Sequence, residues 1–204
     1  YGLMVNVLRC FGFTGRGWVV MWEISSGRLS ATLLRPISYA GSCLAQDMAQ
    51  KLVHLAAAIL EVSFLVLVLG ARWHAPQSMA TWALFGASVV LSSLLFFTLE
   101  MLVSTLAFWT SESGGPLFCF ELLLQFASGA FFPLDVLPGW AQTVLKATPF
   151  PAIVFQPLNI YLERVSHAEA LSLLALQTAW LAGAAFVASA LWTRGVASYG
   201  AEGG

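Results

Sequence analysis

The sequence contains very few charged residues. Only 9% of its 204 residues are Asp, Glu, Lys or Arg, whereas a soluble domain carries about 25%. Hydrophobic residues make up 59% of the chain, and its mean hydropathy is +0.81. These values exclude a soluble catalytic domain and are typical of a chain that lies in a lipid bilayer. The net charge of −1 indicates neither a nucleic-acid partner nor an acidic substrate.

Motifs that carry common chemistry are also missing. No GxxxxGK[ST] phosphate-binding loop occurs, so the chain cannot bind ATP in that way. The three histidines and three cysteines are isolated and include no HExxH or CxxC pattern, which argues against a metal site and a disulfide framework. Ser128 lies in FASGA, without the GxSxG frame of a nucleophile elbow. We therefore expect no enzymatic activity, no catalytic residue and no cofactor in this chain.

Long apolar segments fill most of the sequence. A transmembrane helix needs about 20 apolar residues, and five such spans are predicted, at about 1–22, 52–71, 78–109, 117–132 and 171–192. The chain is thus expected to be an all-α integral membrane protein, a polytopic helical bundle that forms a single transmembrane domain over 1–204. Because the first residues are already apolar, we expect a sixth, N-terminal span to be missing from this sequence.

Two less apolar stretches, 23–51 and 133–170, are expected on opposite sides of the membrane. Four basic residues fall on the side of the first stretch and of the tail 193–204, and three on the other side. Basic residues concentrate in cytoplasmic loops. This count predicts a cytoplasmic first stretch and tail, and an extracellular second stretch.

The first stretch begins with ISSGRLSATLLRP, residues 24–36. Gly27 permits a turn, Leu29, Leu33 and Leu34 fall on one helical face, and Pro36 can begin a new helix. Arg28 and Arg35 add fixed positive charge. An amphipathic segment, 37–52, then leads into the membrane. Such an element can dock into the groove of a soluble partner or lie on the lipid headgroups, and the pattern alone leaves both interpretations open.

The second stretch is rich in proline. Pro133 and Pro138 end one helix, residues 139–147 resemble a short second helix, and Pro149 ends that second helix. Trp140 and its apolar neighbours are unusual for a solvated loop. We therefore favour a segment that partly re-enters the bilayer, where other helices can shield its backbone, over a loop that only caps the bundle.

A few polar residues remain inside the predicted spans. Glu121, Gln125 and Ser128 lie on one face of their helix, as do Ser93, Glu100 and Ser104 on another. A charged side chain facing lipid is costly, so these residues and Glu61 are expected in the bundle interior or along a translocation path. For Glu61 and Glu100 we favour a structural role, and for Glu121 a functional one.

Four fragments, in the same order, resemble the permease subunit of type 2 ABC exporters. They are GRLSATLLRP at 27–36, LAFWTSESGG at 106–115, SGAFFPLDVLPGW at 128–140 and ATPF at 147–150. The likeness covers nearly the whole chain and is closest to the branch whose permeases work beside a separate ATP-binding subunit.

The resemblance implies six helices per permease chain, a coupling helix between the second and third, and re-entrant external helices between the fifth and sixth. On this sequence the coupling region would be 24–52, and the external segment 133–157. It further implies a second permease chain, identical or related, and an ATP-binding subunit that holds ATP and Mg. The location would be the plasma membrane of a bacterium or archaeon.

Two other functions remain open from the sequence. A secondary transporter could use Glu61, Glu100 or Glu121 as a proton relay. A membrane scaffold would transport nothing.

Overall fold

The computed structural model describes residues 2–13, 15–70, 75–110 and 114–202, and within these ranges the chain is helical without strands. The α-helices are α1 (Gly2–Gly12), α2 (Arg16–Ser25), α3 (Leu29–Leu33), α4 (Tyr39–Leu69), α5 (Met79–Ser104), α6 (Gly114–Ala127), α7 (Gly139–Lys146), α8 (Phe155–Tyr161) and α9 (His167–Glu202). Three short 3₁₀ turns accompany them: η1 (Thr105–Phe108), η2 (Leu134–Val136) and η3 (Phe150–Ala152).

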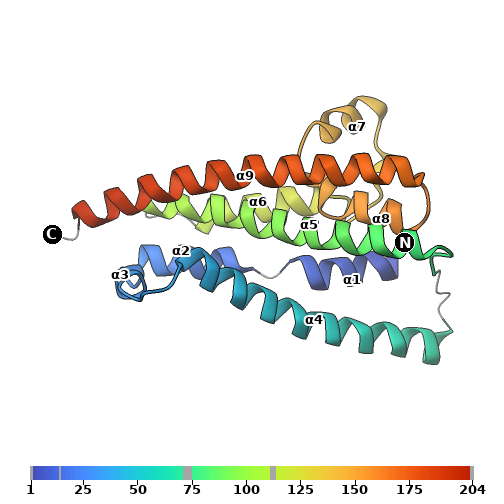
Figure 1. Ribbon diagram of the computed structural model, residues 1–204, viewed down its shortest axis with the longest axis horizontal. Coiled ribbons are helices and arrows are strands. Elements are labelled where there is room, and N and C mark those ends of the chain that lie inside the picture. Colours follow the sequence, from blue (N-terminus) through green and yellow to red (C-terminus); the bar gives the residue numbers. More distant parts are fainter. Residues whose placement is uncertain (1, 14, 71–74, 111–113, 203–204) are drawn as a thin grey trace.

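The central element is α5, which packs along α9 and also contacts α2, α8, α1 and α6. In the most apolar 18-residue stretch of each helix, 56% of α5 is buried, against 17% of α4 and 11% of α9. Figure 1 shows α4 separating from the other helices toward its C-terminal end, where α1 lies between it and α5. The apolar outer surfaces of α4 and α9 are those that a bilayer would cover.

Three of the described helices are long and apolar enough to cross a membrane: Tyr39–Val68, Met79–Phe108 and His167–Tyr199. The third predicted segment, 78–109, matches α5 and η1 closely. Helix α6 has 14 residues and is therefore about 21 Å long, shorter than a hydrocarbon core of about 30 Å.

The bounds of the other segments need correction. The segment 1–22 is divided into α1 and α2, because Gly15 adopts a left-handed conformation with φ 65°. Helix α6 ends at Ala127 and not at 132, because Gly129 adopts a left-handed conformation with φ 85°. The Ser128 carbonyl then accepts a hydrogen bond from the Phe155 backbone N–H at 3.0 Å. Residues 1, 14 and 71 of the predicted spans lie outside the described residues.

Two helices extend beyond the predicted spans at their N-terminal ends. The amphipathic segment 37–52 and the span 52–71 form one continuous helix, α4, which begins at Tyr39, where the Ser38 hydroxyl accepts a hydrogen bond from the Gly41 N–H. Helix α9 begins at His167 and not at 171. There Ser166 and Glu169 each bond the other's backbone N–H, at 2.8 and 3.3 Å, which is a capping box. Helix α9 also continues through most of the predicted tail 193–204.

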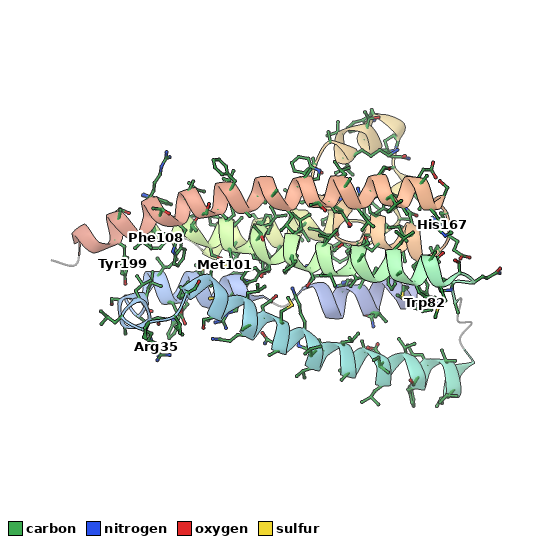
Figure 2. The ribbon with its side chains drawn as sticks, in the orientation of Figure 1. Arg35, Trp82, Met101, Phe108, His167 and Tyr199 are labelled. Atoms are coloured by element: carbon green, nitrogen blue, oxygen red, sulfur yellow. The ribbon has the colours of Figure 1, made fainter. Side chains whose placement is uncertain are left out.

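Two hydrophobic clusters lie at opposite ends of the bundle. One joins α1, α5, α8 and α9, with Phe96, Leu158 and Tyr161 among its buried members. The other joins α2, α3, α4 and α5 around Leu29 and Met101. Figure 2 shows Arg35 at the same end as Phe108 and Tyr199, and Trp82 and His167 at the opposite end.

Candidate functional site

The coupling-like segment forms a compact corner between α2 and α4. Gly27, with φ 78°, makes the turn that a residue with a side chain would rarely adopt. Leu29 is 0% exposed and packs in the second hydrophobic cluster, whereas Leu34 is 87% exposed. The corner is therefore anchored by one leucine and presents the following residues outward.

The exposed part of this corner is the end of α3 and the turn after it. Leu33, Leu34, Arg35 and Pro36 are all exposed. Of the three leucines predicted on one helical face, Leu29 is buried, whereas Leu33 and Leu34 are exposed. Pro36 does not begin the next helix, since the turn continues to the cap at Ser38.

Three aromatic contacts hold the corner in place. The Tyr39 hydroxyl donates a hydrogen bond to the Glu23 carboxylate at 2.6 Å. The Tyr39 ring stacks on Trp192 of α9, with centroids 4.8 Å apart. The Arg28 guanidinium lies 4.8 Å from the centroid of the Trp22 ring, a favourable cation–π distance. The corner is thus fixed to α2, α4 and α9.

A buried ion pair lies on α4, a little over two turns beyond the corner. Lys51 Nζ is 2.7 Å from the Asp47 carboxylate, and both side chains are 0% exposed. The same Nζ donates to the Ser93 carbonyl of α5 at 3.2 Å. Two fully buried charges need each other, because an unpaired one would be strongly destabilising. The pair also joins α4 to the central helix.

Glu100 of α5 is 1% exposed and contacts the first turn of α2. One of its carboxyl oxygens accepts the Gly17 N–H at 3.3 Å, where a helix N-terminus favours a carboxylate. The Ser104 hydroxyl lies 2.9 Å from the Gly17 carbonyl and 2.7 Å from that of Glu100. Helices α2 and α5 therefore meet through buried polar contacts.

Gly17 makes this close approach possible, and we expect Gly17→Ala to lower the free energy of unfolding by about 1–3 kcal/mol. A Cβ atom at Gly17 would lie 2.9 Å from the Ser104 Oγ and 3.3 Å from the Glu100 Cβ. Gly86→Ala is the matched control, because no atom lies within 4 Å of a Cβ at that position of α5. Unfolding of the purified protein in mixed micelles of increasing SDS content measures both variants. Equal stability of the two would contradict the close approach.

Several buried polar atoms beside these contacts have no hydrogen-bond partner within the described ranges. They are Arg16 Nε, Ser93 Oγ, Glu100 Oε1 and Ser128 Oγ. Arg16 contacts the Cys43 sulfur of α4 at 4.0 Å through its Nη2. Some buried donors and acceptors between α2, α4 and α5 are therefore not hydrogen-bonded to any of the described residues.

The other predicted acids lie in different surroundings. Glu121, on α6, is partly buried and accepts a hydrogen bond from the Trp18 indole. Gln125, one turn on, accepts from Arg9 at 3.4 Å. Glu61 does not lie in the interior of the described bundle: it is exposed on α4 and accepts from Asn6 at 2.9 Å. At this depth α4 packs against α1, and Glu61 lies on an exposed side of that contact.

The external segment has the short helix that the sequence predicts, α7, between Pro138 and Ala147. No residue of α7 is buried, and Trp140 is 73% exposed. The described helices therefore do not shield α7, and Figure 1 shows it standing off the bundle beside α8 and α9. Pro133 precedes η2 and Pro149 precedes η3, so each marks a change of direction.

The fold is that of an all-α, multi-pass membrane protein with a cap at one end and an exposed corner at the other. A family model described as ABC-2 family transporter protein matches residues 5–203. The chain belongs to this family of transporter membrane subunits, and its role is that of a permease of an ABC-type transporter. No match was found among curated proteins or among solved structures.

The sequence did not predict the buried positions of Asp47, Lys51 and Gln177. The first two were placed on the polar side of the amphipathic segment 37–52, where opposite charges four residues apart on a helix indicate an ion pair but not its burial. Gln177 of α9 is 0% exposed and bonds Ser88, Ser92 and the Ala152 carbonyl. A lone glutamine in an apolar span was the available indication.

Proposed function

We propose that the chain is the membrane subunit of an ATP-driven exporter, coupled through the corner at 24–36 to a separate subunit that binds ATP and Mg. The observation that carries this proposal is the exposed end of α3, with Leu34 and Arg35 projecting from a corner fixed on three helices. An apolar side chain beside an arginine suits the central contact of a protein interface.

The contacts of the corner suggest how a displacement would reach the interior. Helices α2 and α4 flank α3 directly and are joined by the bond from Tyr39 to Glu23. Each also contacts α5, through Gly17 and Glu100 and through Lys51 and Ser93. A force on α3 would therefore move two helices against the central one, with buried polar contacts at both junctions.

The same proposal assigns roles to α6, to segment 133–157 and to the end of the bundle that carries α3. The face of α6 with Glu121 and Gln125, and Ser128 just after the end of that helix, line the path together with Glu100, next to a second permease chain. Segment 133–157 closes the external end, and the end with α3 faces the cytoplasm of a bacterium or archaeon. Family membership and the arrangement of the two ends in Figure 1 support this assignment.

The proposal is tested by Arg35→Glu. Reversing an exposed charge at the centre of an interface should reduce the recovered complex at least about tenfold. The measurements are the amount of ATP-binding protein, labelled with a photoreactive ATP analogue, that copurifies in mild detergent, and the ATPase activity of that complex. Ala168→Glu is the control, because it adds a carboxylate at an exposed position in the first turn of α9, at the opposite end of the bundle.

Unchanged labelling and ATPase activity in Arg35→Glu would contradict the proposed coupling site. Transport that survives ATP depletion but collapses with the proton gradient would instead indicate a secondary transporter. If proteoliposomes showed no substrate flux under either energy source, the result would indicate a membrane scaffold that transports nothing.

A further inference from the structure

A pocket of about 220 Å³ lies between α7 and α8, outside the sites described so far. Its polar lining includes Lys146, Asn159 and Arg164, and its apolar lining includes Leu145 and Phe155. Figure 1 shows α7 and α8 at the end of the bundle where α9 begins. The pocket therefore combines a polar and an apolar wall at one end of the spanning helices.

The pocket has an excess of positive charge. Its charged lining residues are Asp135, Lys146 and Arg164. Arg164 Nη1 donates to the Asp135 carboxylate at 3.0 Å, which balances one of the two cations. Lys146 has no hydrogen-bond or ion-pair partner in the part of the chain that the structure describes. The chemistry of the site thus favours an anion with several acceptor oxygens.

The position of the pocket relative to the membrane follows from its neighbours. Helix α9, a candidate span, begins at His167, three residues after Arg164. On α7, Trp140 and Val144 are four residues apart, on one face, and are 73% and 60% exposed. Tryptophan concentrates at the level of the lipid headgroups, and an amphipathic helix lies at the same level with its apolar face toward the acyl chains.

Helix α7 is held over the pocket by polar contacts. The Gln142 side chain donates to the Leu137 carbonyl at 2.9 Å and to the Asp135 carbonyl at 3.3 Å. No residue of the helix is buried. The wall formed by α7 therefore rests on the loop that carries Asp135, and the ion pair of Asp135 with Arg164 connects this loop to the start of α9.

We propose that this pocket binds the phosphate group of a membrane lipid, with Lys146 and Arg164 contacting the phosphate oxygens and Asn159 donating from its amide. Leu145 and Phe155 contact the first carbons beyond the phosphate. The mixed walls and the headgroup level distinguish a lipid from free phosphate, which needs no apolar wall. The assignment does not depend on ATP-driven transport, because lipid retention is measured without a partner subunit.

The test measures how many phosphatidylglycerol molecules stay bound to the purified chain by native mass spectrometry, after extraction from nanodiscs of mixed phosphatidylcholine and phosphatidylglycerol. Lys146→Gln should retain about fivefold less phosphatidylglycerol, because one basic residue near an anionic lipid is worth about that factor. Arg194→Gln is the matched control, an exposed arginine near the far end of α9.

Asp135→Asn gives the opposite result and separates binding from folding. Removing this carboxylate releases Arg164 and should raise retention about fivefold, which a misfolded chain would not show. Equal retention in the wild type, Lys146→Gln and Asp135→Asn would overturn the proposal. Displacement of the lipid by millimolar inorganic phosphate would also overturn it, since the site would then bind a free anion.

Discussion

Lys51→Met is expected to lower the free energy of unfolding by about 3–5 kcal/mol. The substitution keeps the length of the side chain but removes the ammonium group that lies 2.7 Å from the Asp47 carboxylate, and both side chains are 0% exposed. It also removes the hydrogen bond to the Ser93 carbonyl. The Asp47 carboxylate would then remain buried without this ammonium group, in a part of the chain where hydration is scarce. Unfolding in mixed micelles of increasing SDS content, followed by circular dichroism, measures the loss.

The double variant Asp47→Leu/Lys51→Met distinguishes the effect of an unpaired charge from the effect of lost packing. Because both charges are replaced by apolar groups of similar volume, it should recover most of the lost stability. Lys146→Met, at an exposed lysine, should change the stability by less than about 0.5 kcal/mol. If the double variant were as unstable as Lys51→Met, lost packing and not an unpaired charge would explain the effect.

The ion pair shows which part of the fold composition could not predict. Low charge and long apolar runs correctly predicted a helical membrane protein, and family membership confirmed it. The sequence placed Asp47 and Lys51 on the polar side of an amphipathic segment, 37–52, outside the membrane, and isolated charges are costly in lipid. Paired charges escape that cost in part, and a continuous helix from Tyr39 brings the two together.

Periodicity predicted more of the central helix than of its neighbours. Ser93, Glu100 and Ser104 were assigned to one face of α5, and all three are buried. The assignment is correct because α5 is surrounded by packed helices, so its polar side chains lie in the bundle interior. Glu61 is exposed in contrast, since α4 contacts α1 there and Glu61 lies on an open side of that contact. A single sequence does not encode where a helix separates from its neighbours.

The breaks in the helices were predictable to different degrees. Proline correctly marked the ends of α7, because it removes a backbone donor. The cap at Ser166 was also readable, since serine three residues before glutamate is the capping-box pattern. The end of α6 was also readable, since a glycine, Gly129, follows it in the left-handed conformation with φ 85°.

Gln177→Leu is expected to lower the free energy of unfolding by about 2–4 kcal/mol, since each buried polar group left unpaired costs about 1–3 kcal/mol. The Gln177 amide accepts from Ser88 at 3.0 Å and donates to the Ala152 carbonyl at 2.7 Å. It also donates to Ser92, whose hydroxyl reaches the same carbonyl at 2.7 Å. One side chain thus joins α9, α5 and η3 in the interior.

Thr178→Leu is the matched control for this network. Thr178 is the next residue of α9, is exposed, and bonds only the Leu174 carbonyl of its own helix. A leucine side chain at that position would lie on the outer surface of the bundle. The free energy of unfolding of Thr178→Leu should therefore stay within about 0.5 kcal/mol of the wild type. The same unfolding titration compares the two variants. Equal stabilities would show that the network contributes nothing beyond the volume of the side chain. A loss confined to Gln177→Leu would show that the packing of η3 against α5 and α9 depends on the Gln177 amide, in addition to the bond from Ser92.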